Sequence, residues 1–137
     1  MTDSLARLRA AGVSIWLDDL SRDRLISGSL AVLARDKHVS GVTTNPTIFA
    51  RSIIDSNVYT GQLRDLRVRQ AAPDQALREL TTSDVRCACD VLRTVYDATE
   101  GGDGRVSIEV DPRFAYDPER TVAEENPMEF LNPLPDS

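Results

Sequence analysis

The stretch VSGVTTNP, residues 39–46, shows how this sequence is assembled. Its β-branched character predicts a short strand, which ends at Asn45 because a residue before proline avoids the helical region. Pro46 suits the first turn of a helix, so a helix is expected to follow directly. Helical spacing then continues to Leu66, with a break expected over residues 55–57. A strand that leads into a helix is the repeating unit of a parallel α/β fold.

Apolar runs on either side of this stretch predict two more strands, VSIWL at residues 13–17 and RVSIEV at 105–110. Helical patterns precede the first two strands, at residues 4–11 and 22–37. The order strand, helix, strand, helices, strand indicates a parallel sheet with right-handed crossovers. The pattern alone leaves a barrel and an open doubly wound sheet as alternatives.

The segment between the second and third strands is predicted to be helical. A helix is expected to start at residue 73 or 74, and Thr82 or Ser83 would cap a second helix. Apolar residues from Val85 to Tyr96 form an amphipathic stripe. Cys89 belongs to this stripe, whereas Cys87 would face another way on the helix, and their spacing suits neither a disulfide nor a zinc site.

Composition narrows the class of protein. The 137 residues are 41% hydrophobic and 28% charged, which fits one globular domain with its own core. The net charge of −6 and the lack of a basic stripe argue against nucleic-acid binding. The sequence shows neither a membrane-spanning apolar run nor a secretory signal, so we expect a cytoplasmic protein without a membrane partner.

Polar side chains close all three predicted strands. Asp18 ends the first strand, Thr44 and Asn45 end the second, and Glu109 followed by Asp111 ends the third. The carboxyl ends of parallel strands carry the active site in α/β folds. The same residues are also common wherever a strand gives way to a loop, so both interpretations remain open.

Glu109 is the most informative of these residues. In a sheet buried on both faces it would project into the interior, as an acid/base group or as a structural carboxylate with a hydrogen-bond partner. Asp18 with Glu109 or Asp111 could also bind a divalent metal. His38 is the single histidine and is expected in a surface turn, so we predict no metal site.

Three motifs carry a specific resemblance: VSIWLDDLS at residues 13–21, GVTTNPTIF at 41–49 and GRVSIEVDPR at 104–113. Together with the connecting segment LTTSDVRCACDVLRTVYDATEGGDG, residues 80–104, they resemble bacterial transaldolases of the actinobacterial and cyanobacterial branch. The resemblance covers roughly residues 1–124, and we expect residues 125–137 to form a divergent proline-rich tail.

The resemblance implies a (β/α)₈ TIM barrel of the class I aldolase type. Such enzymes move a dihydroxyacetone unit from sedoheptulose 7-phosphate to glyceraldehyde 3-phosphate, in the non-oxidative pentose phosphate pathway. They use a Schiff-base lysine on strand four and no metal or organic cofactor. By resemblance, Asp18 handles the substrate hydroxyl proton and Asn45, with Thr44 beside it, binds the dihydroxyacetone unit. Glu109 acts through a water in Schiff-base formation.

The chain departs from this pattern in length. A barrel of this type needs about 250 residues, so 137 residues supply only about three strands. Lys37 is the only lysine and precedes the second strand, so the strand-four lysine has no counterpart. We therefore expect a partial barrel, the N-terminal portion of a transaldolase, inactive alone and self-associating through exposed sheet edges. The alternatives are a smaller class I sugar-phosphate aldolase and a non-catalytic α/β interaction module.

Overall fold

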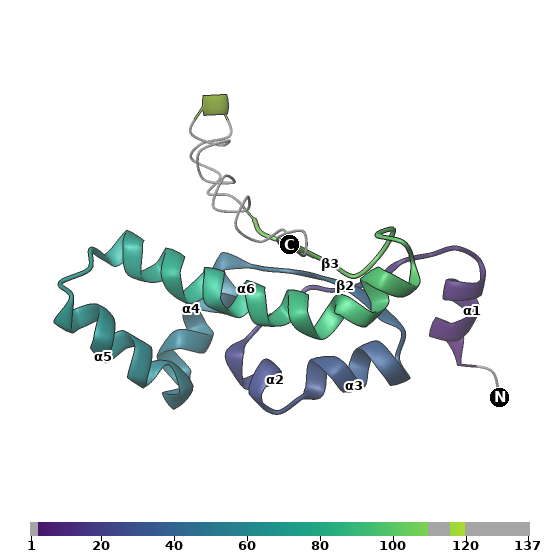
Figure 1. Ribbon diagram of the computed structural model, residues 1–137, viewed down its shortest axis with the longest axis horizontal. Helices are drawn as coiled ribbons and strands as arrows, with labels where there is room; N and C mark the ends of the chain where they lie inside the picture. The colour runs from purple at the N-terminus through teal and green to yellow at the C-terminus, as the bar shows by residue number, and fades with distance from the viewer. Residues whose placement is uncertain (1–2, 110–115, 120–137) are drawn as a thin grey trace, which may run out of the picture.

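The computed structural model describes residues 3–109 and 116–119. Helices connect the three strands of a small sheet (Figure 1). The elements are α1 (Ser4–Ala10), β1 (Ile15–Leu17), α2 (Arg22–Ile26), α3 (Ser29–Asp36), β2 (Val39–Thr43), α4 (Pro46–Asp55), the 3₁₀ helix η1 (Asn57–Tyr59), α5 (Thr60–Val68), α6 (Pro73–Ala98) and β3 (Arg105–Ser107). Among the described residues, no helix has both the length and the apolar character needed to cross a bilayer.

The sheet confirms the predicted α/β class. Its strands lie in the order β1-β2-β3, and both pairs are parallel. Leu17 pairs with Val42, which in turn pairs with Val106, so the three strands are in register near their carboxyl ends. The strands are shorter than predicted, since β1 begins at Ile15 and β3 ends at Ser107.

The helical pattern predicted within residues 22–37 is confirmed and forms two helices, α2 and α3. They are separated at Gly28, whose φ of 73° is a left-handed conformation that ends a helical turn. One helix prediction was wrong. The separate helix expected to start at Thr82 or Ser83 does not exist, since α6 runs unbroken past both. Tertiary packing outweighs their capping propensity, because α6 buries residues on one face both before and after this point.

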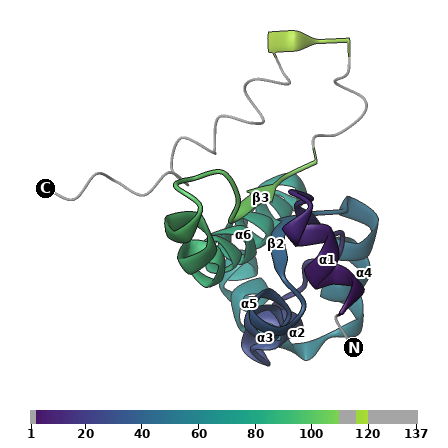
Figure 2. The same ribbon diagram turned by 90° about the vertical axis from the view of Figure 1, so that its right-hand side faces the viewer.

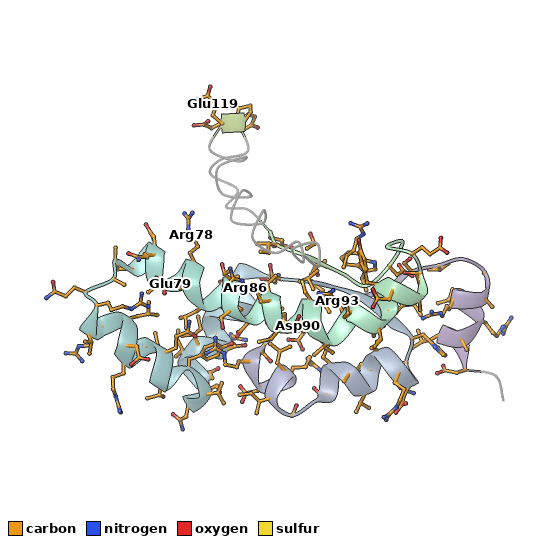
Figure 3. The ribbon with its side chains drawn as sticks, in the orientation of Figure 1. Arg78, Glu79, Arg86, Asp90, Arg93 and Glu119 are labelled. Atoms are coloured by element: carbon orange, nitrogen blue, oxygen red, sulfur yellow. The ribbon has the colours of Figure 1, made fainter. Side chains whose placement is uncertain are left out.

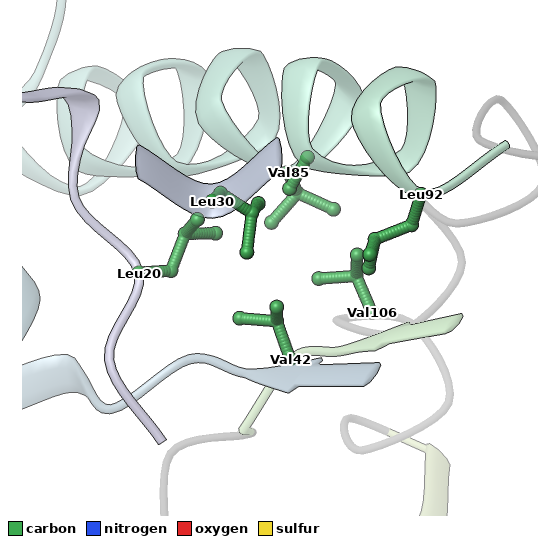
Figure 4. Close-up of a cluster of buried hydrophobic side chains, with 7 residues drawn as sticks. Leu20, Leu30, Val42, Val85, Leu92 and Val106 are labelled. Atoms are coloured by element: carbon green, nitrogen blue, oxygen red, sulfur yellow. The ribbon is translucent and has the colours of Figure 1, made fainter. Parts of the chain in front are cut away.

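One face of the sheet is covered by helices. Val42 and Val106 point from the strands toward Leu30 of α3 and toward Val85 and Leu92 of α6, and all five side chains are at most 9% exposed (Figure 4). In Figure 2, α3 and α6 accordingly lie on the same side of β2 and β3. Burying apolar side chains of this size contributes about 1.5–3 kcal/mol each, so this contact is the main stabilising layer of the sheet.

The opposite face, which we call the open face, is not covered by any described helix. Side chains alternate along a strand, so the residues next to the core residues Leu17, Val42 and Val106 point away from the helices. The open face therefore carries the following residues: Trp16, Asp18, Gly41, Thr43, Ser107 and, beyond the end of β3, Glu109. Arg105 also flanks Val106, but its guanidinium turns back to the carbonyl of Gly101 at the amino end of β3. The described chain supplies helices to one face only, so within it the sheet is not buried on both faces.

Trp16 and Gly41 fit together on the open face. The indole lies so close to Gly41 that a Cβ added there would come within 2.4 Å of Trp16 Cε2, which only glycine avoids. The indole nevertheless stays 41% exposed, because nothing described covers its other side. A large aromatic side chain with this much exposed area is typical of a surface against which another element packs.

A second core lies between α4, η1, α5 and α6, and Phe49, Tyr59, Leu66 and Leu80 fill it. A buried polar network connects this core to the sheet. Asp84 of α6 is 1% exposed and accepts hydrogen bonds from Tyr59 Oη at 2.7 Å and from Arg22 Nε at 2.6 Å. The backbone N–H of Arg22 donates to Tyr59 Oη at 3.0 Å, and the guanidinium stacks 4.4 Å from the Tyr59 ring centroid.

Burial controls the ionisation of this network. It raises the pKa of the Asp84 carboxyl above its ordinary value, although the hydrogen bonds from Tyr59 and Arg22 act in the opposite direction. Burial and the bond to Asp84 also raise the pKa of the Tyr59 hydroxyl, which therefore remains a donor at neutral pH. The three groups fix α2 and η1 against α6.

Asp84→Ala should be strongly destabilising. Removing one member of a buried ion pair leaves the other charge uncompensated and costs about 3–5 kcal/mol. Tyr59→Phe should cost about 1–3 kcal/mol, because it leaves Asp84 and the Arg22 N–H short of a partner. Urea unfolding followed by circular dichroism measures both. Asp90→Ala, on the exposed outer side of α6, is the matched control, and equal midpoints for the Asp84 and Asp90 variants would contradict this account.

Candidate functional site

The carboxyl ends of the three strands bring the predicted site residues to one end of the sheet. Because Leu17, Val42 and Val106 are in register, Asp18 is level with Thr43 and Ser107. Asn45 lies two residues after Thr43, and Glu109 lies two residues after Ser107. Polar groups from three separate strands therefore meet at the edge where α/β folds bind substrates.

Asp18 is exposed on the open face and held by one neighbour. Thr43 Oγ1 donates a hydrogen bond of 2.6 Å to Asp18 Oδ1. The other oxygen, Oδ2, has no partner among the residues the structure describes, and can accept a further proton or hydroxyl. The adjacent Asp19 forms an ion pair with Arg24 of α2 instead, so the two aspartates have different surroundings.

Asn45 is the N-cap of α4, and the oxygen and the nitrogen of its side-chain amide have different roles. Its Oδ1 accepts hydrogen bonds from the backbone N–H groups of Thr47 at 3.0 Å and Ile48 at 3.3 Å, as an N-cap does. Capping uses only the side-chain oxygen. Within the described part of the chain, the amide nitrogen has no acceptor, so it can donate to a ligand at the carboxyl end of β2.

Thr44 and Glu109 are connected through the main chain. Thr44 is 3% exposed and is not on the open face. Its N–H donates to the carbonyl of Ser107 at 2.9 Å, and its Oγ1 accepts from the backbone N–H of Glu109 at 3.2 Å. These bonds extend the β2–β3 pairing beyond the last regular residue of β3. Glu109 is thereby fixed by its backbone while its side chain remains exposed.

The exposure of Glu109 corrects one expectation. The sequence predicted a carboxylate projecting into a buried interior, whereas the structure places it on the open face with water around it. Ile108 before it packs against the helix-covered core, which explains why Glu109 points the other way. The carboxylate would be enclosed only if further structure covered the open face.

Two residues of this end of the sheet were missed by the sequence analysis, Thr43 and Ser107. Thr43 contacts Asp18 directly, and Ser107 pairs with Thr43 on the neighbouring strand. Both are small hydroxyl residues next to a buried valine. Counting alternate positions outward from Val42 and Val106 would have placed both on the same face as Asp18.

Lys37 lies at the opposite end of the sheet. It follows the last residue of α3, just before β2 begins, and its Nζ is 3.9 Å from Asp3 Oδ2 with the side chain 56% exposed. His38 beside it has a φ of 60° and forms the turn into β2, as predicted. Neither residue can reach the carboxyl ends of the strands. Asp111, the other strand-three carboxylate, lies outside the described residues.

The described residues contain no group of three or more His, Cys, Asp or Glu side chains that could hold a metal ion. A shallow cavity of about 380 Å³ lies between α2 and α4, lined in part by Asp23, Thr47, Arg51 and Asp55. It includes neither Asp18 nor Glu109. The arrangement at the strand ends consists of two carboxylates, one amide and two hydroxyls, which suits proton transfer and hydrogen bonding to a polyhydroxy ligand.

Comparison with known proteins agrees with this geometry. Residues 15–126 match the transaldolase/fructose-6-phosphate aldolase family. The chain is 63% identical to a transaldolase of Acidothermus cellulolyticus over 131 residues, which is 96% of this chain and 35% of that protein. It is 56% identical to a transaldolase of Frankia alni over 131 residues, again 96% of this chain and 35% of the relative.

A transaldolase of Streptomyces avermitilis, its transaldolase 2, is 53% identical over all 137 residues and is covered to 37% of its length. The chain thus spans little more than a third of the curated relatives that it matches. The three strands and their helices correspond to part of the TIM barrel that the family implies. Since the family match extends over most of the sequence, this chain belongs to the transaldolase/fructose-6-phosphate aldolase family.

Proposed function

We propose that this chain provides the first three βα units of a transaldolase and, with them, part of its active site. The reaction would transfer a dihydroxyacetone unit from sedoheptulose 7-phosphate to glyceraldehyde 3-phosphate through a lysine Schiff base, in the cytoplasmic pentose phosphate pathway. The observation that carries the proposal is the common placement of Asp18 and Glu109, which come from different strands to the same end of the open face.

Asp18 is proposed to transfer the proton of a substrate hydroxyl. Breaking the carbon–carbon bond of a ketose releases a carbonyl compound, and the hydroxyl that becomes this carbonyl must lose its proton to a base. The hydrogen bond from Thr43 restrains Asp18 Oδ1 and leaves Oδ2 free to act. Thr43 is therefore a positioning residue for this base.

Glu109 is proposed to act through a water during formation and hydrolysis of the Schiff base, which require protons to be moved to and from the carbinolamine oxygen and the lysine nitrogen. Thr44 supports it by holding the Glu109 backbone N–H, a role that fits its burial better than direct contact with substrate. Asn45 would donate from its amide nitrogen to a hydroxyl of the dihydroxyacetone unit, while its oxygen keeps α4 capped.

The chain alone should be inactive. Its only lysine, Lys37, is exposed at the amino end of the strands and paired with Asp3, where it faces none of the proposed groups. An exposed amine that is not desolvated lacks the activation that Schiff-base lysines need. The Schiff-base lysine would have to come from another strand of the barrel.

A chimera tests the proposed roles. The 131-residue matching segment of the Acidothermus cellulolyticus transaldolase is replaced by the corresponding residues of this chain. The chimera should be active. Within it, Asp18→Asn and Glu109→Gln should each lower kcat by about 10²–10⁴-fold with a smaller effect on KM, because acid/base groups act in the transition state. Asp90→Asn, on the exposed side of α6, is the control and should leave kcat unchanged.

The isolated chain serves as the second control in this experiment. Incubated with fructose 6-phosphate and borohydride, it should give no trapped adduct, whereas the chimera should be labelled at a lysine outside the inserted segment. An inactive but folded chimera, or saturable labelling of Lys37 in the isolated chain, would refute the proposed function.

We also propose that the isolated chain associates weakly through its sheet edges. Within residues 3–109 and 116–119, β1 and β3 each pair only with β2, so their outer edges carry backbone groups without a strand to bind. Sedimentation velocity over a hundredfold concentration range should show a sedimentation coefficient that rises with concentration. A single species of monomer mass at all concentrations would contradict this expectation.

A further inference from the structure

The hydroxyl of Tyr59 lies at the start of α2, inside the protein. Tyr59 is completely buried, and its Oη accepts the backbone N–H of Arg22 at 3.0 Å while it donates to Asp84 Oδ2 at 2.7 Å. Arg22 is the first residue of α2, and the first N–H groups of a helix have no acceptor within their own helix. Tyr59 supplies that acceptor, so it fixes the point at which α2 begins.

The start of α2 is connected to Asp18 by a short turn. Arg22 follows Asp18 by four residues in the chain. Between them, Asp19 forms an ion pair with Arg24 of α2, and Leu20 is 1% exposed in the helix-covered core. The turn is therefore tied to α2 by a side chain as well as by the backbone. A displacement of α2 would move the Asp18 carboxylate with it.

The ring of Tyr59 contacts the element that follows β2. Its centroid is 6.0 Å from that of Phe49 on α4, at an interplanar angle of 71°, which is an edge-to-face contact. Phe49 is 2% exposed, and its backbone N–H donates to the carbonyl of Asn45 at 2.8 Å. The ring of Tyr59 thus holds the first turn of α4, which Asn45 caps. One side chain therefore contacts both segments that carry proposed site residues.

The charges around Tyr59 suit a fixed geometry better than a gain in stability. Of the charged side chains on α6, all of which the structure describes, only Asp84 is buried, whereas Arg86, Asp90 and Arg93 are exposed (Figure 3). Arg22, which pairs with Asp84, has a buried Nη2 without a hydrogen-bond partner among the described residues. A buried ion pair is often no more stabilising than apolar side chains of the same volume. Its directional bonds do, however, hold Tyr59 in one orientation.

We propose that Tyr59 is a positioning residue of the transaldolase site. Its hydroxyl sets the place of Asp18 through α2, and its ring sets the place of Asn45 through α4. This inference rests on the proposed function, in which Asp18 is a base and Asn45 binds the dihydroxyacetone unit. Tyr59 acts through the two helices and needs no contact with substrate, so its hydroxyl and its ring should have separable effects.

Tyr59→Phe removes the hydroxyl and keeps the ring. In the present chain, amide exchange resolved by NMR should become at least about tenfold faster at the Arg22 N–H relative to Val42 in β2, because Arg22 loses its acceptor. The amide resonances of residues 18–20 should broaden as the turn loosens. Leu66→Val shortens another side chain of the second core and is the matched control. It should leave the ratio of the two exchange rates unchanged.

The same variants in the active chimera test the effect on the reaction. The kcat is expressed per site trapped with fructose 6-phosphate and borohydride, so unfolded protein is not counted. Tyr59→Phe should lower kcat by at least about tenfold with little change in KM, because a displaced base acts in the transition state. Phe49→Leu removes the ring contact and should raise KM by a similar factor with little change in kcat, because Asn45 contacts the substrate before and during the reaction. Leu66→Val should change neither.

The two measurements separate a positioning role from a general effect of stability. An unchanged exchange ratio at Arg22, or a Tyr59→Phe chimera that loses no more kcat than the Leu66→Val chimera, would overturn this inference and leave the proposed function intact. Equal losses of kcat in all three variants would show a general effect of core packing and would also overturn it. A folded but inactive chimera would refute the proposed function and this inference with it.

Discussion

The described part of the structure depends on β2, which has a strand on either side and helices packed on one of its faces. Val42 is the centre of this arrangement, since it pairs with Leu17 and Val106 and packs under α3 and α6. Because Val42 must point toward the helices, Gly41 and Thr43 must point away from them. That alternation decides which residues are core and which are available for chemistry. It places Thr43 where its hydroxyl donates to Asp18, and it places Thr44 where its hydroxyl accepts from the backbone N–H of Glu109.

The buried network of Arg22, Tyr59 and Asp84 has a different role. The helix-covered core and the second core share α6 but are otherwise formed by different elements. Asp84 connects them, because it binds α2 on one side and η1 on the other. The start of α4 follows directly from the carboxyl end of β2, so the packing of this second core also influences the position of Asn45. The network is thus remote from the open face, yet it helps to hold the residues at the carboxyl end of β2 in position.

Much of this could be predicted from the sequence. The three strands, their parallel order and the helix beginning at Asn45-Pro46 followed from local patterns: apolar runs, a residue before proline, and an amphipathic stripe. The predictions failed where local preference met tertiary packing. Thr82 and Ser83 have the composition of a helix start, but α6 continues because it packs on both cores. The apolar spacing correctly indicated α3, but it did not show that the left-handed Gly28 separates α3 from a shorter helix, α2.

The candidate site shows the same limit. Asp18, Asn45 and Glu109 were identified from their places at strand ends and from the family resemblance. The face on which each residue lies depends on the register, which the sequence does not state. Glu109 was expected in a buried interior because parallel strands usually have both faces covered, and the described chain covers one. The half-exposed Trp16 is the clearest sign of this difference.

The central claim is that the elements described for residues 3–109 and 116–119 leave β1 and β3 as sheet edges and the face opposite the helices uncovered. Amide hydrogen exchange on the dilute, monomeric chain, resolved by residue with NMR, tests this claim most directly. The account predicts slow exchange along β2, fast exchange for the amides of β1 and β3 that point away from β2, and ready access of solvent to the Trp16 indole N–H. Equal protection of all three strands, with a protected indole, would mean that the edges and the open face are already covered in the monomer, and would contradict it.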